Sequence, residues 1–117
     1  MAVQEAEARR KYPYHRRFVR HRVRVKVHVI NGKSYSTWTL NLSQDGLCFE
    51  IPVPLEVGKE VAVSVYLSRD KKSAPVDAIC RVVWNDAGKG GKHRHGGQFV
   101  SFSADGQARL VEGLKRI

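Results

Sequence analysis

The chain of 117 residues has the length of one domain, and its 42% apolar and 27% charged residues are typical of a folded globular protein. No apolar run approaches the about 18 residues that a membrane span needs, and two cysteines, Cys48 and Cys80, are too few for a disulfide scaffold or a thiolate zinc site. The net charge of +10 is concentrated in residues 1–33, where ten Lys and Arg face two acids, which favours an anionic partner such as a nucleotide, a nucleic acid or a membrane surface.

The N-terminal stretch, residues 1–21, is predicted to be a flexible basic arm. It has neither helical nor strand periodicity, and Pro13 interrupts any helix there. Its beginning contains acids and no apolar run, unlike a secretory signal, so we expect a cytoplasmic protein. Residues 22–117 are expected to form the folded domain.

The first two strands are predicted between residues 23 and 42. Four valines at positions 23–29 alternate with polar residues, which is typical of a half-buried strand. The Asn-Gly pair at 31–32 then favours a two-residue hairpin turn. The return strand, at about 35–42, is expected to place three apolar side chains on one face, namely Trp38, Leu40 and Leu42.

Four further strands follow, separated by residues that favour turns. They are expected at about 47–51, 61–67, 76–84 and 98–102, where apolar residues recur with the period of a strand. Segment 85–97 holds five glycines and is therefore predicted to be a flexible loop.

The C-terminal segment is predicted to be a short helix. Ser103 is a candidate N-cap, and residues 104–116 would present Leu110 and Leu114 on one side. Two glycines weaken this helix, so it must pack on the body of the domain to persist. Six short strands and one terminal helix predict a mainly β fold, a six-stranded antiparallel β-barrel that hides its strand edges by closure.

Two polar clusters carry the candidate chemistry. Arg16 and Arg20 are four residues apart in the arm, and a guanidinium group can chelate a guanine edge, pair with phosphate or stack on a base. Asn41 and Ser43 lie two residues apart on one predicted strand, so their side chains face the same way and offer hydrogen bonds together. Gly46 allows a positive φ or a close approach of a ligand to the backbone. Together these residues are expected to form a pocket wall with a cationic clamp.

Each cluster by itself is a weak signal. An arginine pair four residues apart is frequent in basic segments and occurs again here at Arg20 and Arg24. An Asn-x-Ser-x-x-Gly run is often only a capped turn, and Asn41-Leu42-Ser43 is a glycosylation acceptor only in a secreted protein. The order of the two clusters within a pattern of six strands is more specific than either cluster.

In that arrangement the sequence resembles the PilZ domain family. Members of this family have an RxxxR motif on an N-terminal arm and a D/N-x-S-x-x-G motif after the second strand of a six-stranded barrel. Segments 80–84 and 97–102 are also similar to the closing strands of the family, so the resemblance covers about residues 15–116. The residues that match the two motifs are Arg16, Arg20, Asn41, Ser43 and Gly46.

The resemblance implies that the domain binds cyclic di-GMP, a bacterial second messenger with two guanines and two phosphates, and needs no cofactor. In such domains the motif arginines, here Arg16 and Arg20, take guanine edges and phosphates. The second motif, here Asn41 and Ser43, takes the other guanine contacts, and the arm wraps over the ligand.

Three residues near the motifs have two interpretations each. Trp84, at the expected end of the fifth strand, would stack on a guanine as an aromatic does in some relatives, or would simply belong to the end of the barrel. Arg17 would reach a phosphate or point to solvent. His15 would influence how many ligand molecules bind or would be a solvated arm residue.

Other candidate chemistry is weaker. His93 and His95 lie in the basic segment 89–97 without a nearby carboxylate or thiol, which makes a poor metal site and favours a solvated loop. Cys48 and Cys80 are expected to be buried as small apolar residues. The sequence has no Ser-His-Asp order, phosphate-binding glycine loop or paired-carboxylate motif, so we expect neither an enzyme nor a metal site.

The sequence therefore predicts a cyclic di-GMP receptor that changes conformation on binding and relays the signal to an unidentified partner protein. Neither a membrane span nor a specific nucleic acid is expected as a partner. Two alternatives remain open. A basic OB-like barrel would bind nucleic acid, for which Tyr35, Trp38 and Tyr66 are the candidate exposed aromatics. A protein-interaction module with a lapsed ligand site is the other alternative, and the intact motifs argue against it.

Overall fold

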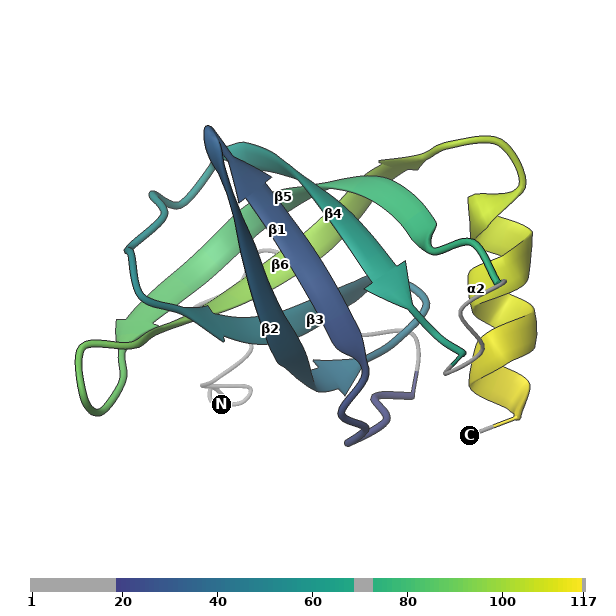
Figure 1. Cartoon of the computed structure of the whole chain (residues 1–117), viewed down its shortest axis with the longest axis horizontal. Helices are drawn as coiled ribbons and strands as arrows, with labels where there is room; N and C mark the ends of the chain where they lie inside the picture. The colour runs from purple at the N-terminus through teal and green to yellow at the C-terminus, as the bar shows by residue number, and fades with distance from the viewer. Residues whose placement is uncertain (1–18, 69–72, 117) are drawn as a thin grey trace, which may run out of the picture.

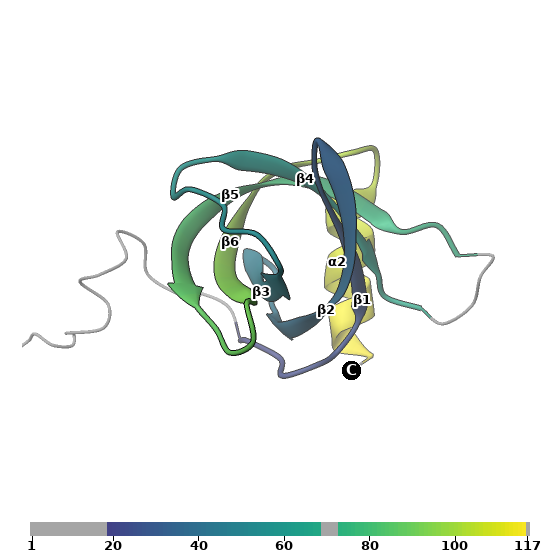
Figure 2. The same cartoon turned by 60° about the vertical axis from the view of Figure 1, so that its left-hand side comes forward.

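Six strands close into a barrel in the computed structural model, which describes residues 19–68 and 73–116 (Figures 1 and 2). Neighbouring strands follow the order β1-β2-β3-β6-β5-β4, and every pairing is antiparallel. The predicted antiparallel barrel is thereby confirmed. The strands are β1 (Lys26–Asn31), β2 (Lys33–Leu42), β3 (Gly46–Ile51), β4 (Glu60–Tyr66), β5 (Val76–Ala87) and β6 (His93–Phe102).

The interior of the barrel is filled by the apolar side chains that alternate along the strands. Val27 and Val29 of β1 pair with Val65 and Val63 of β4, and each is at most 1% exposed. Burial of one such side chain contributes on the order of 1.5–3 kcal/mol. Since a slip of one residue would turn these valines to solvent, the alternation fixes the register of the strands.

The helix α2 (Gly106–Lys115) packs across one end of the barrel, next to the beginning of β5 (Figure 1). Leu110 and Leu114 are buried and join the core, as the predicted apolar side of the helix requires. Gly106 permits this approach, because a Cβ there would lie 3.3 Å from Cγ1 of Val76. Among the described residues, no helix is both long and apolar enough to cross a bilayer.

The start of the helix differs from the prediction that Ser103 is its N-cap. Ala104 has a φ of 48°, and the Gly106 N–H donates to the Ser103 carbonyl at 2.9 Å, so a tight turn precedes the helix. Asp105 occupies the cap position and makes no side-chain cap hydrogen bond. The helix therefore begins after this turn.

Strand β2 contains a bulge that overturns the predicted apolar face. Trp38 is 49% and Leu40 is 38% exposed, whereas Leu42 is fully buried. The register with β3 shifts between Thr39 and Asn41, so the alternation of inward and outward side chains changes there. Thr39 is buried in place of its apolar neighbours, and Trp38 and Leu40 face solvent.

The hairpin of β5 and β6 is longer than predicted. The segment expected to be a flexible loop is mostly strand, and only residues 88–92 connect the two strands. Gly90 and Gly91 have φ values of 66° and 79° and so serve the turn. Gly96 and Gly97 lie within β6, where both are buried. Their glycine character therefore reflects close packing within the sheet.

Candidate functional site

The turn between β2 and β3 is fixed by its own hydrogen bonds and by β6. The Ser43 N–H donates to the Gly46 carbonyl at 2.9 Å, and the Ser43 hydroxyl donates to the Asp45 carboxylate. The Phe99 N–H of β6 donates to the Asp45 carbonyl at 2.8 Å. Ser43 is fully buried. Its hydroxyl therefore orders the turn, and the turn is joined to the sheet on which the site is built.

Gly46 is required by a close contact between β3 and β6. A Cβ at this position would lie 2.1 Å from the carbonyl oxygen of Gly97, far inside van der Waals contact. Gly46 is not one of the described glycines with positive φ, so the conformational reason considered from the sequence does not apply. In this structure the Gly97 backbone makes the close approach.

Arg20 reaches this corner of the barrel from the segment before β1. Its Nη1 donates to Oδ1 of Asn41 at 2.8 Å and lies 3.8 Å from Sγ of Cys48. Within residues 19–68 and 73–116, the Nε of Arg20 is buried and has no hydrogen-bond partner. No carboxylate of these residues forms an ion pair with Arg20. The guanidinium group thus keeps both positive charge and unused donor capacity.

The segment that carries Arg20 is attached along β2. His21 pairs with Leu42 through two backbone hydrogen bonds of 2.8 and 2.9 Å. Further along, the Thr39 hydroxyl donates to the Val23 carbonyl at 2.6 Å and accepts from the Val25 N–H at 3.1 Å. These bonds explain why Thr39 is buried in the bulged strand, and they hold the Arg20 backbone beside Asn41.

The strand register aligns four outward positions next to Arg20. Asn41 pairs with Cys48, Cys48 with Gly96, and Gly96 with Trp84, so these residues form one row across β2, β3, β6 and β5. We call them the site row. The Trp84 indole lies directly against Gly96. A Cβ on Gly96 would be only 2.0 Å from the indole Nε1, so a larger residue does not fit there. At the spacing of adjacent strands the row spans about 14 Å, with an amide at one end and an aromatic ring at the other.

The interior beneath the site row holds an uncharged histidine. His95 is fully buried, stacks on Phe49 with ring centroids 5.1 Å apart, and accepts a hydrogen bond from the Leu55 N–H at 2.9 Å through Nε2. Burial, and then the proximity of His93, lower the pKa of His95. The prediction that His95 belongs to a solvated loop is therefore wrong.

The two cysteines are free thiols within the packed domain. Cys80 is fully buried, and burial raises the pKa of its thiol to about 12. Cys48 is 6% exposed beneath Arg20, so both cysteines are buried as predicted. No cluster of three or more His, Cys, Asp or Glu suited to a metal ion occurs in residues 19–68 and 73–116.

The structure brings together only part of the predicted site. Arg20 and Asn41 are in direct contact, and Ser43 and Gly46 lie in the adjoining turn. Trp84 lies within β5 rather than at its end, three strands from Asn41. Cys48 and Gly96, which complete the row, have no signal in the sequence apart from their small size. Three candidates lie outside the described residues, namely His15, Arg16 and Arg17.

The model of the PilZ domain family matches residues 9–116. The chain belongs to the PilZ domain family. This match includes both motif segments and the whole barrel, in agreement with the resemblance of about residues 15–116 found in the sequence. No curated protein matches the sequence.

Solved structures show the same fold at low sequence identity. The Bacillus subtilis inhibitor of motility MotI/DgrA is 18% identical, with a TM-score of 0.71 over 88% of this chain and 51% of its own. The PilZ domain of Escherichia coli YcgR, solved with c-di-GMP, is 15% identical, with a TM-score of 0.63 over 88% of this chain and 93% of its own. The K. pneumoniae MrkH–c-di-GMP complex is 16% identical, with a TM-score of 0.65 over 87% of this chain and 52% of its own. The chain thus spans about half the length of MotI and MrkH.

Proposed function

We propose that this PilZ domain is a receptor for cyclic di-GMP. The observation that carries the proposal is the hydrogen bond between Arg20 and Asn41. It lies at one end of the site row, and Trp84 lies at the other end. A guanidinium group that pairs with no carboxylate of residues 19–68 and 73–116 suits phosphate or the O6/N7 edge of guanine, and an indole suits a purine face. Family membership and the c-di-GMP complexes of YcgR and MrkH support the same ligand.

The motif residues have separate roles in this proposal. Arg16 and Arg20 hold guanine edges and phosphates of the ligand, with Arg17 as a further phosphate contact. Asn41 accepts a hydrogen bond from Arg20, so a ligand that takes this guanidinium frees the amide for guanine. Ser43 orders the turn beside Asn41 through its bond to Asp45.

Trp84 and Gly46 shape the surface on which the ligand lies. The Trp84 indole lies against Gly96, and its proposed role is to stack on a guanine of the ligand. Gly46 keeps β3 against β6, so that the site row remains continuous. A larger residue at Gly46 would separate the two strands that carry Cys48 and Gly96.

The proposed response is closure of the basic arm over the bound ligand, next to Arg20 and His21, which the structure already holds against β2. This arm has a high density of positive charge, and two phosphates of the ligand would neutralise the arginines that contact them. The ordered arm and the nucleotide then present a surface to a partner protein. The domain acts as a receiver in this proposal and performs no catalysis.

Calorimetric titration of the whole chain with cyclic di-GMP tests the proposal. We expect saturable binding that Arg20→Ala and Arg16→Ala each weaken by tenfold or more, on the order of one lost bidentate contact. Arg94→Ala is the matched control, because it removes an exposed arginine whose Nε lies 2.8 Å from Glu50 and not in the site row. Absence of heat at high micromolar ligand contradicts the proposal, and equal losses in all three variants indicate charge attraction alone.

A further inference from the structure

A second set of outward side chains lies on the barrel face formed by β4, β1 and β2. Lys26 of β1 pairs with Trp38 of β2 on one side and with Tyr66 of β4 on the other. All three point away from the core, since their neighbours Val27, Thr39 and Val65 are buried. We call Trp38, Lys26 and Tyr66 the aromatic row. Trp38 is 49% exposed, and Tyr66 is half-buried with its ring edge against His28. A lysine between two aromatic rings thus faces solvent.

The surface around the aromatic row is positively charged. Arg22, Arg24 and Lys26 are exposed at alternate positions, and none of them forms an ion pair within the described residues. Strands β1 and β2 contain no acidic residue. Asp77, on the neighbouring part of this face, accepts a hydrogen bond of 2.6 Å from Ser64. The cations therefore remain available to an anionic partner.

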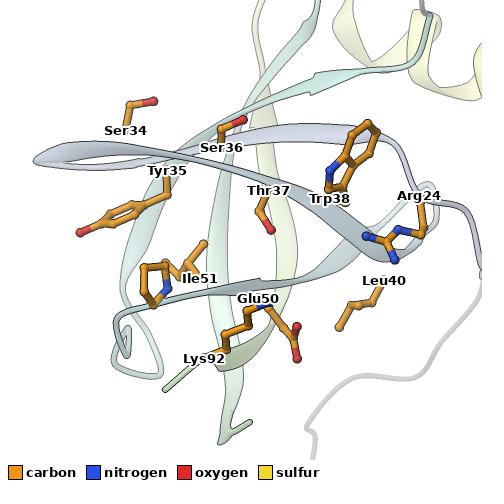
Figure 3. A pocket seen from close by; sticks show the side chains of 11 residues that line it. Arg24, Ser34, Tyr35, Ser36, Thr37, Trp38, Leu40, Glu50, Ile51 and Lys92 are labelled. Atoms are coloured by element: carbon orange, nitrogen blue, oxygen red, sulfur yellow. The ribbon is translucent and has the colours of Figure 1, made fainter. Parts of the chain in front are cut away.

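A groove of about 580 Å³ continues this surface past Trp38, where β2 separates from β3. Figure 3 shows Arg24 and Trp38 at one end of the groove and Tyr35 at the other. Lys92 lines the groove as well. Among the residues that line the groove, the one acidic side chain is Glu50, and it forms an ion pair of 2.8 Å with Arg94. The groove is thus wide enough for a nucleotide and combines aromatic rings, hydroxyl groups and the cations Arg24 and Lys92.

We propose that this face binds single-stranded nucleic acid. Bases stack on Trp38 and Tyr66, while Lys26 and Arg24 contact the phosphates between them. Single-strand binding surfaces in proteins combine basic grooves with exposed aromatic rings in this way, largely without sequence preference. The aromatic row lies on β4, β1 and β2 and is separate from the site row on β2, β3, β6 and β5, although the groove beside Trp38 also includes Glu50 and Ile51 of β3. We therefore expect the two ligands to bind at different positions.

Nucleic acid fits this face better than an anionic membrane surface does. Trp38 lies within a strand, and its outward neighbours along β2 are the serines Ser34 and Ser36 on one side and Leu40 on the other, so hydroxyl groups interrupt the apolar surface. Insertion into a bilayer needs a continuous apolar surface that projects from the protein. Hydroxyl groups beside a flat aromatic surface instead suit bases and sugar–phosphate groups.

Fluorescence anisotropy of labelled dT15 and rU15 oligonucleotides with the whole chain tests the proposal. We expect binding that weakens steeply with salt, and a duplex that binds less tightly because its bases cannot stack on Trp38. Trp38→Ala is expected to weaken binding on the order of tenfold, and Trp38→Phe to restore most of it. Lys26→Ala is expected to lower the salt slope by about 0.7, the change for one phosphate contact to a single strand.

Two control variants separate this surface from general charge and from the nucleotide site. Lys115→Ala removes an equal charge from α2 and is expected to change oligonucleotide affinity less than twofold, as is Arg20→Ala. Thermal melts verify that Trp38→Ala remains folded. Oligonucleotide affinity that Trp38→Ala leaves unchanged, or that Lys115→Ala lowers as much as Lys26→Ala, overturns the proposal. The proposal is also overturned if Trp38→Ala weakens binding to phosphatidylglycerol vesicles but leaves oligonucleotide binding unchanged.

Discussion

The two outer faces that meet at β2 differ in what covers them. On one side the site row is built from small residues, and Arg20 and the Trp84 indole lie over Cys48 and Gly96. On the other side Trp38 of the aromatic row is 49% exposed, whereas Tyr66 is half-buried against His28. Both faces rest on the same buried valines and leucines. The interior of this barrel therefore determines the fold, while each outer face is free to acquire its own chemistry.

Gly46→Ala is expected to have the largest effect, because it breaks the site face and spares the aromatic row. The new methyl group would meet the Gly97 carbonyl at 2.1 Å, so β3 and β6 must move apart. We expect a loss of about 2 to 3 kcal/mol in the free energy of unfolding, as for overpacked cores, and a fall of about 10 °C in melting temperature. Chemical and thermal denaturation measure both.

Gly32→Asn is the control for that loss. Gly32, unlike Gly46, has a positive φ, of 75°, but a Cβ there meets nothing within 4 Å, and asparagine tolerates this conformation. We expect a change of a few tenths of a kcal/mol. A loss in Gly46→Ala as small as that in Gly32→Asn would show that the contact with the Gly97 carbonyl does not make glycine necessary at position 46.

The two tryptophans provide a matched pair that sharpens the comparison of the faces. Trp84→Ala is expected to weaken cyclic di-GMP binding on the order of tenfold by removal of a stacking surface, whereas Trp38→Ala leaves it unchanged. Oligonucleotide binding is expected to show the reverse pattern. Calorimetry and anisotropy on the same two variants measure these four affinities. A single variant that weakens both ligands equally would mean that the two faces form one binding surface.

His95 predicts an acid sensitivity of the site face. Burial lowers the pKa of His95 in the folded state. Below the ordinary histidine pKa of about 6.5, the unfolded chain therefore binds a proton at His95 that the folded chain does not bind. Stability contributed by the neutral form is thus fully present above this pH. It decreases as the pH falls further, with a slope of at most about 1.4 kcal/mol per pH unit.

Urea denaturation between pH 8 and pH 5 measures that slope. His95→Gln is the informative variant, since glutamine keeps an acceptor for the Leu55 N–H but does not titrate. The difference in slope between the two proteins isolates His95 from the other histidines, which titrate in both. Identical slopes would mean that His95 becomes protonated without loss of its hydrogen bond.

The sequence predicts the parts of this fold that depend on local alternation. Val61, Val63 and Val65 face the core as expected, and the chain reverses near Gly32, although Asn31 pairs with Lys33 instead of forming a two-residue turn with Gly32. The bulge in β2 was not predicted, because it follows from the hydrogen bonds that Thr39 makes to the segment before β1. Strict alternation therefore predicts Trp38 and Leu42 on the same face, whereas Trp38 is exposed and Leu42 is buried.

The candidate site depends on register, which a single sequence does not reveal. The motifs indicate that Arg20 and Asn41 belong together, although 21 residues separate them. The site row also needs Cys48, Gly96 and Trp84 at matching positions on three other strands. Glycines in segment 85–97 predicted a loop, whereas Gly96 and Gly97 are glycines because Trp84 and Cys80 occupy the space of a side chain. Composition alone does not distinguish these two causes.

The smallest expected effect concerns the cover that Arg20 provides to Cys48. The thiol is 6% exposed, and the Arg20 guanidinium lies 3.8 Å from its sulfur. Arg20→Ala is therefore expected to increase the rate of Cys48 alkylation by N-ethylmaleimide severalfold, whereas Cys80 stays unreactive because its pKa is about 12 and it is fully buried. Arg24→Ala removes the same charge from the aromatic side of β2 and is expected to leave the rate unchanged. Equal rates in the wild type and Arg20→Ala would show that Arg20 does not cover the site row in solution, and the asymmetry between the two faces would then rest on Trp84 alone.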